Sequence, residues 1–191
     1  MGGNELLILA SGSPRRRELL AQADIACTVE PSAYEEASPQ QAAPADYVVA
    51  QALGKARDIS QHHAGQWVLG ADTVVTVDHM ILGKPHSPEE AAAMLRRLSG
   101  RSHSVFTGVA LVKDRQELSC IVETTVWFRA LADWEISRYV GSGEPMDKAG
   151  AYGIQGKAAS FVEKIDGSYT NVVGLPLAQV HELLVKAGVA L

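Results

Sequence analysis

Residues 6–17, LLILASGSPRRR, join a short unbroken apolar run to a group of small and basic residues. The run Leu6–Ala10 has the length of a buried strand and ends at small residues that favour a tight turn. Ser13 is a good N-cap and Pro14 suits the first helical position, and the apolar residues that follow extend this helix to about Asp24. The segment therefore predicts a strand, a tight loop and a helix.

The rest of the chain alternates strand-like and helix-like segments. Short apolar and β-branched runs predict strands at 27–30, 67–77, 104–113, 118–128 and 160–165, the two long ones as an antiparallel pair. Apolar residues at helical spacing, with cap signals, predict helices at 46–61, 88–99, 133–140 and 177–186. A stretch rich in Ser, Pro, Gln and acidic residues, 31–44, predicts an exposed loop.

The composition is that of a folded globular protein of one domain, or of two small lobes that share a sheet. Of its 191 residues 47% are hydrophobic and 20% charged, which argues against a disordered or membrane-embedded chain. The net charge of -5 argues against duplex nucleic acid as a partner, because binding to the phosphate backbone relies on clustered Lys and Arg. Without a basic n-region or a run that approaches a membrane span, we expect a cytoplasmic protein that binds no membrane.

The turn between the first strand and the first helix gathers groups that suit an anion. A helix N-terminus directs free backbone N–H groups at one point, here beside the hydroxyls of Ser11 and Ser13. Arg15 and Arg16 add planar guanidinium donors that match phosphate oxygens. The alternative is an ordinary capped helix whose arginines, Arg15, Arg16 and Arg17, face solvent. These residues alone favour the phosphate site and the capped helix about equally.

Asp72 is a carboxylate inside an otherwise apolar predicted strand. A buried charge is costly unless it is paired or binds a metal, so Asp72 is a candidate functional residue. The alternative is an Asp in a strand-end turn that hydrogen-bonds to the backbone. Judged by residue type alone, the two interpretations have roughly equal weight. Glu36 lies beside Glu35 in the predicted exposed loop, and it matters only if the fold brings it to Asp72.

Three further residues could engage a nucleotide. Lys55, on the predicted helix 46–61, and Lys84 would each neutralise phosphate charge, although an isolated Lys is more often a surface residue. Gln155 lies among glycines in the segment 150–156, and its amide suits reading a base edge, with a plain loop as the alternative. The sequence contains no HExxH, GxGxxG, GxxxxGK[ST] or GxSxG motif, which argues against the sites that those motifs build.

Taken together, these segments resemble the Maf family of nucleotide pyrophosphatases over about residues 6–184. The resemblance rests on SGSPRR at 11–16, GADTV at 70–74, LGKP at 82–85, DKAGAYGIQG at 147–156, GSY at 167–169 and VGLP at 173–176. It implies an α/β fold, an elongated and twisted mixed β-sheet with flanking helices and two lobes around a central cleft, formed by residues 1–191 as a single domain. Family members are often homodimers, so the resemblance also implies a homodimer as the alternative to a monomer.

The resemblance further implies a reaction. The enzyme would hydrolyse dTTP or UTP, and also modified pyrimidine nucleotides, to the monophosphate and pyrophosphate. This reaction would remove non-standard nucleotides from the nucleotide pool. Asp72 would activate water as the base, and Glu36 and Asp72 would hold a divalent metal cation, Mg²⁺ or Mn²⁺, which suits an all-oxygen site. The substrate would be bound by Ser11, Ser13, Arg15, Arg16, Lys55, Thr73, Lys84 and Gln155.

Three of these positions separate subgroups of the family. By the resemblance, Arg15, Thr73 and Gln155 are the residues of dTTP/UTP pyrophosphatases, as opposed to a sister group that acts on 7-methyl-GTP. Gln155 and Thr73 also argue against a purine-type pyrophosphatase. The alternative from another class is a regulatory nucleotide-binding protein linked to septum formation and arrest of cell division.

The sequence departs from the family pattern at one turn. Family members commonly have Gly where this chain has His79, after Asp78. Histidine tolerates a positive φ less well than glycine, so we expect a different or longer turn with no effect on the chemistry. In the acidic pair, Glu35 is the alternative to Glu36 as the metal ligand.

Overall fold

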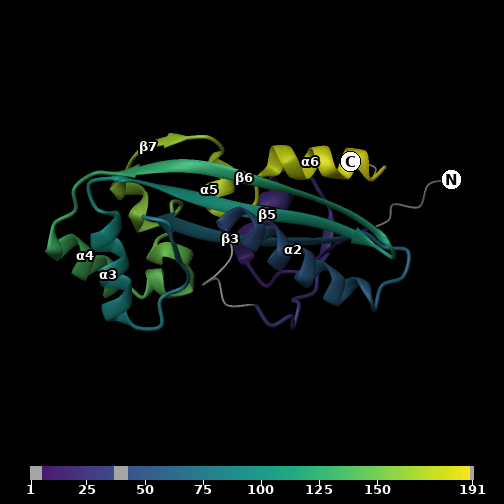
Figure 1. The fold of residues 1–191 in the computed structure, drawn as a ribbon, viewed down its shortest axis with the longest axis horizontal. Coiled ribbons are helices and arrows are strands. Elements are labelled where there is room, and N and C mark those ends of the chain that lie inside the picture. The colour runs from purple at the N-terminus through teal and green to yellow at the C-terminus, as the bar shows by residue number, and fades with distance from the viewer. Residues whose placement is uncertain (1–5, 37–42, 190–191) are drawn as a thin grey trace. The chain divides into compact units, whose positions relative to one another are not determined.

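The computed structural model describes residues 6–36 and 43–189, and the chain divides into two compact units (Figure 1). The first unit comprises the chain up to Asp72, Thr107–Val122 and the chain from Gly174 onward. The second comprises Thr73–Phe106 and Glu123–Val173.

The first unit begins with the predicted strand, loop and helix. Strand β1 (Leu7–Leu9) is buried at all three residues, and α1 (Pro14–Gln22) leads to β2 (Cys27–Val29), which pairs with β1 in parallel. Helix α2 (Pro44–Ser60) leads to β3 (Val68–Val77), whose first residues pair in parallel with the other edge of β1. Parallel neighbours need such helical crossovers, so the apolar runs and the helices predicted between them explain this order.

Two glycines let α2 approach the sheet unusually closely. A Cβ atom at Gly70, on β3, would lie 2.2 Å from the Ala52 carbonyl oxygen, and one at Gly108 would lie 2.3 Å from the Val48 carbonyl oxygen. Figure 1 shows α2 running alongside β3 and β5 (Ser102–Lys113), the strands that carry these glycines. Because the helix presents Ala52 and Ala56 to this surface, its backbone packs against the strands without a layer of large side chains.

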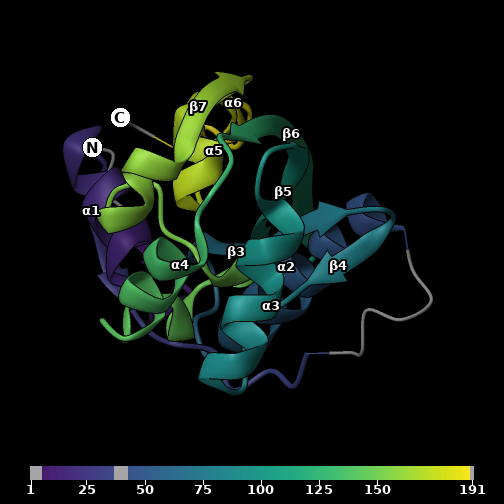
Figure 2. The same ribbon diagram turned by 90° about the vertical axis from the view of Figure 1, so that its left-hand side faces the viewer.

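The second unit contains the rest of β3 and most of the remaining short elements. Its helices α3 (Pro88–Leu98) and α4 (Asp133–Val140) lie side by side (Figures 1 and 2). The other elements are β4 (Met80–Leu82), the 3₁₀ helices η2 (Glu144–Asp147), η3 (Ala149–Ala151) and η4 (Lys157–Phe161), β7 (Val162–Asp166) and α5 (Tyr169–Val173).

Within the described residues, the strands, which include β6 (Gln116–Phe128), form one mixed seven-stranded sheet in the order β2-β1-β3-β5-β6-β7, with β4 paired to β3. The predicted long pair is β5 and β6, and β7 pairs with β6 in antiparallel fashion. Strand β6 begins two residues earlier than predicted, because only Asp114 and Arg115 separate it from β5 and Asp114 adopts a φ of 53°. Strand β5 also begins two residues earlier than predicted, at Ser102.

The fold class agrees with the prediction, since the structure is a mixed sheet with flanking helices. Helices α4 and α6 (Leu177–Lys186) have the predicted bounds, whereas α5 was not predicted. The loop predicted at 31–44 lies partly outside the described residues. The central cleft and the single domain stay predictions.

Of the two outcomes expected at Asp78 and His79, a different or a longer turn, the longer turn is wrong. Val77 pairs directly with Met80, so the turn holds two residues, and their φ values are 52° and 62°. This is the pattern of a type I′ hairpin turn, which matches the twist of the flanking strands. The requirements of the hairpin therefore override the lower tolerance of histidine for a positive φ.

None of the helices described is long and apolar enough to cross a membrane.

Candidate active site

Asp72 lies within β3 and not at a strand end. The residue is only 7% exposed, and the strand residues from Val68 to Ala71 that precede it are all buried. The alternative of a strand-end turn is therefore excluded, and the cost of burying a carboxylate has to be offset by neighbouring groups.

Lys55 supplies the nearest compensating charge. Its Nζ donates to Asp72 Oδ1 over 2.6 Å and lies 2.6 Å from Glu36 Oε1. The Lys55 and Asp72 side chains are 14% and 9% exposed, whereas that of Glu36 is 50% exposed. One ammonium group thus links a buried and an accessible carboxylate, and Glu36 is the member of the acidic pair that makes this contact.

The close packing of α2 explains why Lys55 reaches Asp72. Gly70 is two residues before Asp72 on β3, and the helix backbone that it admits belongs to the turns just before and after Lys55. Strand side chains alternate between faces, so Gly70 and Asp72 share the face on which α2 lies. The glycine therefore brings the lysine within range of the carboxylate.

Burial and charge act in opposite directions on Asp72. Burial raises the pKa of its carboxyl group above the ordinary value, while the positive charges of Lys55 and Arg16 lower it, and the net shift is upward. Burial also raises the pKa of Tyr47, on α2, to about 12, with the negative charges of Asp72 and Glu36 adding to the shift. A carboxylate with a raised pKa is a stronger base than an ordinary aspartate.

Arg16 faces the protein interior and not the solvent. Its Nε donates to the Gly174 carbonyl oxygen over 2.9 Å, and its Nη1 donates to the Ala71 carbonyl oxygen over 2.8 Å and to Ser11 Oγ over 3.1 Å. Burial lowers the pKa of Arg16, and the charge of Asp72 opposes that shift. For Arg16, the alternative of an arginine that faces solvent is therefore excluded.

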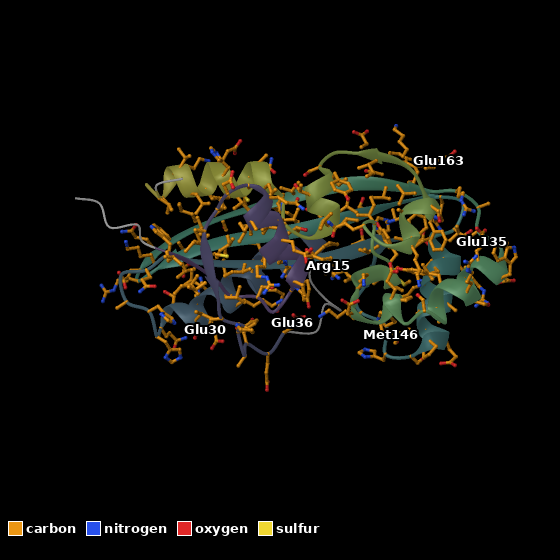
Figure 3. All side chains as sticks on the ribbon, turned by 180° about the vertical axis from the view of Figure 1, so that it is seen from behind. Arg15, Glu30, Glu36, Glu135, Met146 and Glu163 are labelled. Atoms are coloured by element: carbon orange, nitrogen blue, oxygen red, sulfur yellow. The ribbon has the colours of Figure 1, made fainter. Side chains whose placement is uncertain are left out.

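The turn before α1 is organised by Ser11. Ser11 is buried, and its Oγ accepts a hydrogen bond from the Ser13 backbone N–H over 3.3 Å. Ser13 occupies the predicted N-cap position, but its side chain makes no capping hydrogen bond. Figure 3 shows Arg15, half-buried near the start of α1, on the same side of the first unit as Glu36.

Sequence reasoning missed the residues that hold the loop before Glu36. Asp58, on α2, accepts hydrogen bonds from Ser32 Oγ over 2.7 Å and from the Ala33 backbone N–H over 2.9 Å. The Tyr34 ring lies so close to Gly54 that a Cβ there would be 2.4 Å from it. The hydrogen bond from Ser32 lowers the pKa of Asp58. The only sequence signal was the spacing of Gly54, Lys55 and Asp58, which places them on neighbouring helical turns.

The remaining predicted residues belong to the second unit. Thr73 follows Asp72 on β3 and is half-buried, while Lys84 and Gln155 are exposed. The segment with Lys84 is fixed within this unit, because the Gly150 backbone N–H donates to the Gly83 carbonyl oxygen over 3.0 Å. The contacts above thus bring five residues together in the first unit, and we call this group the charged centre: Asp72, Lys55, Glu36, Arg16 and Ser11.

A separate hollow of about 380 Å³ lies between α4 and η4 in the second unit. Its lining residues are Trp134, Glu135, Arg138, Tyr139, Lys157, Ser160 and Phe161. None of the predicted site residues lines this hollow, so it does not extend the charged centre around Asp72.

Comparison with protein families decides the relationship. The model of the family described as Maf-like protein matches residues 6–187. The chain belongs to the Maf family. The Maf match includes all five residues of the charged centre as well as Lys84 and Gln155.

Several Maf relatives match nearly the whole chain. A protein of Myxococcus xanthus named dTTP/UTP pyrophosphatase is 53% identical over 186 residues, which cover 97% of this chain and 94% of the relative. A protein of Escherichia coli O157:H7 with the same name is 52% identical over 179 residues, which cover 93% and 91%. Among solved structures, the Staphylococcus aureus Ham1 protein matches with 13% identity and a TM-score of 0.39 over 66% of this chain and 72% of that one, a likeness too distant to add to the argument.

Proposed function

We propose that this chain hydrolyses dTTP and UTP to the monophosphate and pyrophosphate, with modified pyrimidine nucleotides as further substrates. The observation that carries the proposal is the buried Asp72, paired with Lys55 over 2.6 Å in a chain that belongs to the Maf family. Relatives named dTTP/UTP pyrophosphatase, 52–53% identical over most of their length, support the choice of nucleotide, as does the set Arg15, Thr73 and Gln155.

Asp72 acts as the general base. Its carboxylate accepts a proton from the water that attacks the α-phosphorus, and the bond from that phosphorus to the leaving pyrophosphate breaks. The pKa of Asp72 is raised by burial, which strengthens the base, while Lys55 and Arg16 favour its ionised form. Both conditions are needed, because a protonated carboxyl group cannot take the proton.

Cationic and hydroxyl groups hold the triphosphate. Lys55 and Lys84 offset phosphate charge, and Arg15 and Arg16, with the hydroxyls of Ser11 and Ser13, supply donors near the N-terminus of α1. Gln155 and Thr73 recognise the base. Clearing of non-standard nucleotides before polymerases use them is the proposed purpose.

The donor set fits a divalent cation. Glu36 and Asp72 bring carboxylate oxygens to within 2.6 Å of one Nζ atom, and no three His, Cys, Asp or Glu residues gather in the part of the chain that the structure describes. One or two carboxylates together with substrate phosphates is how Mg²⁺ is usually bound, and Mn²⁺ accepts the same ligands. Glu36 and Asp72 would hold the cation, which would supply charge stabilisation for the departing pyrophosphate.

Further parts of the proposal follow from composition and family. We place the protein in the cytoplasm as a homodimer or a monomer that binds neither nucleic acid nor membrane.

Release of pyrophosphate from dTTP, UTP, CTP, GTP, 7-methyl-GTP and ITP, with Mg²⁺ or Mn²⁺, tests the proposal. The wild-type chain should turn over dTTP and UTP, and Asp72→Asn should lower kcat by about 10³-fold, the usual size of a general-base contribution. Binding of these nucleotides without cleavage would overturn the enzymatic proposal and favour a regulatory nucleotide-binding protein linked to septum formation.

A further inference from the structure

The loop that carries Gln155 is held at both ends by hydrogen bonds to its backbone. The Gly153 N–H donates to Tyr139 Oη over 3.2 Å, and the Lys157 N–H donates to the two carboxylate oxygens of Glu144 over 3.1 and 3.3 Å. These two N–H groups lie two residues before and two residues after Gln155. The exposed glutamine is therefore the midpoint of a segment that is fixed on each side.

The two anchoring groups are joined to each other. Tyr139 Oη donates to Glu144 Oε1 over 3.1 Å while it accepts from the Gly153 N–H. The Tyr139 ring is buried at the end of α4, with its centroid 5.2 Å from that of Phe161. Burial raises the pKa of the Tyr139 phenol, so the hydroxyl keeps the proton that it donates. A single donor–acceptor chain thus runs from the Gly153 N–H through Tyr139 to Glu144.

The turn that holds Glu144 is itself fixed. Glu144 begins η2, which Met146 marks in Figure 3. Lys148 Nζ donates to the Glu144 carbonyl oxygen over 2.7 Å and to Asp147 Oδ1 over 2.6 Å. Glu144 is therefore held through its backbone as well as through its carboxylate.

The glycines of the loop allow this contact. A Cβ at Gly156 would lie 1.9 Å from Glu144 Oε1, and one at Gly153 would lie 2.5 Å from Lys148 Cε. The loop also closes on itself, because the Gly156 N–H donates to the Gly153 carbonyl oxygen over 3.0 Å. The backbone on both sides of Gln155 thus lies directly against the side chains of Glu144 and Lys148.

We propose that Tyr139 and Glu144 are positioning residues that fix the direction of the Gln155 amide and thereby set the selectivity for the base. This inference rests on the proposed function. An amide donates through its nitrogen and accepts through its oxygen, and uracil and cytosine present opposite patterns at their N3 and C4 positions. An amide held in one direction distinguishes the two bases, whereas one on a loose loop adapts to either.

Selectivity measurements on four variants test the proposal. Tyr139→Phe keeps the ring and removes both hydrogen bonds, and Glu144→Ala removes the acceptor for the Lys157 N–H. Each should lower the ratio of kcat/KM for UTP to that for CTP by about tenfold, the equivalent of one lost hydrogen bond. Glu144→Gln keeps one carbonyl acceptor and should restore part of the ratio. Tyr152→Phe is the matched control, since its hydroxyl contacts His103 Nε2 at 2.8 Å and not the loop, and it should keep the wild-type ratio.

A double-mutant cycle separates positioning from a general loss of structure. If Tyr139 acts through Gln155, the ratio for Tyr139→Phe combined with Gln155→Ala should equal that for Gln155→Ala alone. Effects that multiply in the double variant, or an equal loss of selectivity in Tyr152→Phe, would overturn the inference.

Amide hydrogen exchange provides a test that needs no turnover. In the nucleotide-free protein, Tyr139→Phe should speed exchange at the Gly153 N–H and Glu144→Ala at the Lys157 N–H, each by about tenfold. Unchanged exchange would overturn the inference even if the enzyme were active. Failure of the wild-type chain to cleave either dTTP or UTP would overturn the proposed function, while the exchange experiment would still decide whether the anchors exist.

Discussion

The two units hold their candidate functional groups in different ways. In the first unit, Asp72 is buried and its position depends on contacts between charged side chains, with Lys55 at 2.6 Å and Arg16 close enough to lower its pKa. In the second unit, Gln155 is exposed, and the hydrogen bonds at Gly153 and Lys157 hold the backbone of its loop.

This difference separates two kinds of functional effect. A change in the charges around Asp72 alters the base itself, so it should affect every triphosphate equally. A change in the anchors of the Gln155 loop leaves the base intact and should affect one nucleotide more than another. The charges around Asp72 should therefore govern rate, and the anchors of the Gln155 loop should govern selectivity.

The largest expected effect tests this separation directly. Lys55→Met removes the cation between Asp72 and Glu36 and should lower kcat/KM for dTTP and UTP by the same factor, about 10²-fold or more. Because the charge of Lys55 lowers the pKa of Asp72, its loss should raise that pKa further and move the acid limb of the pH–rate profile to higher pH. Lys186→Met, at an exposed position on α6, is the control. Unequal losses for the two nucleotides would argue against the separation.

The next effect concerns the packing that places Lys55. Gly70→Ala puts a Cβ 2.2 Å from the Ala52 carbonyl oxygen, so α2 has to move, and we expect a loss of about 2–3 kcal/mol in the free energy of unfolding. Urea denaturation measures the loss. Gly83→Ala, in the second unit, is the control because no atom lies within 4 Å of the added Cβ. Equal effects of the two substitutions would show that the close approach of α2 contributes little.

A smaller effect concerns the stability cost of the base. The pKa of Asp72 is raised, so its carboxyl group binds a proton more tightly in the folded than in the unfolded chain, and its ionisation destabilises the fold at neutral pH. Asp72→Asn should therefore raise the melting temperature at pH 7 while it abolishes activity. The gain should vanish below the ordinary Asp pKa of 3.8, where the carboxyl group is protonated in both states. A melting temperature lowered at pH 7 would mean that the attraction of Lys55 outweighs burial.

The smallest effects compare one surface ion pair from each unit. In the first unit, the Arg57 side chain is 53% exposed and that of its partner Glu117 is 37% exposed. Because exposed ion pairs contribute little, Glu117→Gln should lower the free energy of unfolding by only about 0.2–1 kcal/mol. Glu135→Gln, in the second unit, should cost more, because Glu135 binds Arg129 through two hydrogen bonds and also accepts from the Ala132 N–H.

The pH dependence of stability tests whether the Arg129–Glu135 pair acts through its charges. Arg129 lowers the pKa of Glu135 to about 2, so the contribution of Glu135 to stability is present above the ordinary value of 4.5 and is lost as the pH falls through about 2. Unfolding measured at pH 7 and at pH 2 should show a difference between wild type and Glu135→Gln only at the higher pH. The same difference at both pH values would show that Glu135 contributes through packing and not through its charge.

Local sequence signals predicted most of the fold. Apolar spacing and caps gave the bounds of α4 and α6, and the strand, turn and helix of the first segment follow from Leu6–Ala10 and Ser13-Pro14. Helix α5 has only five residues, too few for a helical pattern to emerge. At His79, propensity suggested a different or longer turn, and the structure has a two-residue hairpin turn.

The site was predictable as a set of residue types but not as a set of contacts. An Asp in an apolar strand identifies itself, because its burial needs an explanation. The contact of Glu36 with Lys55 depends on Asp58 and Tyr34, which hold the loop against α2 through long-range contacts. The anchors of Gln155 accept from backbone N–H groups, which every residue type except proline carries, so no sequence pattern reveals them.

The close packing of α2 on the sheet also determines which positions can change in evolution. At Gly70 and Gly108 a side chain would meet helix backbone, an obstacle that no rotamer change removes. A deep mutational scan should find these two positions intolerant whether it selects for activity or for protein abundance. Asp72 should be intolerant only under selection for activity, so the two scans together would distinguish positions that build the site from the position that performs the chemistry.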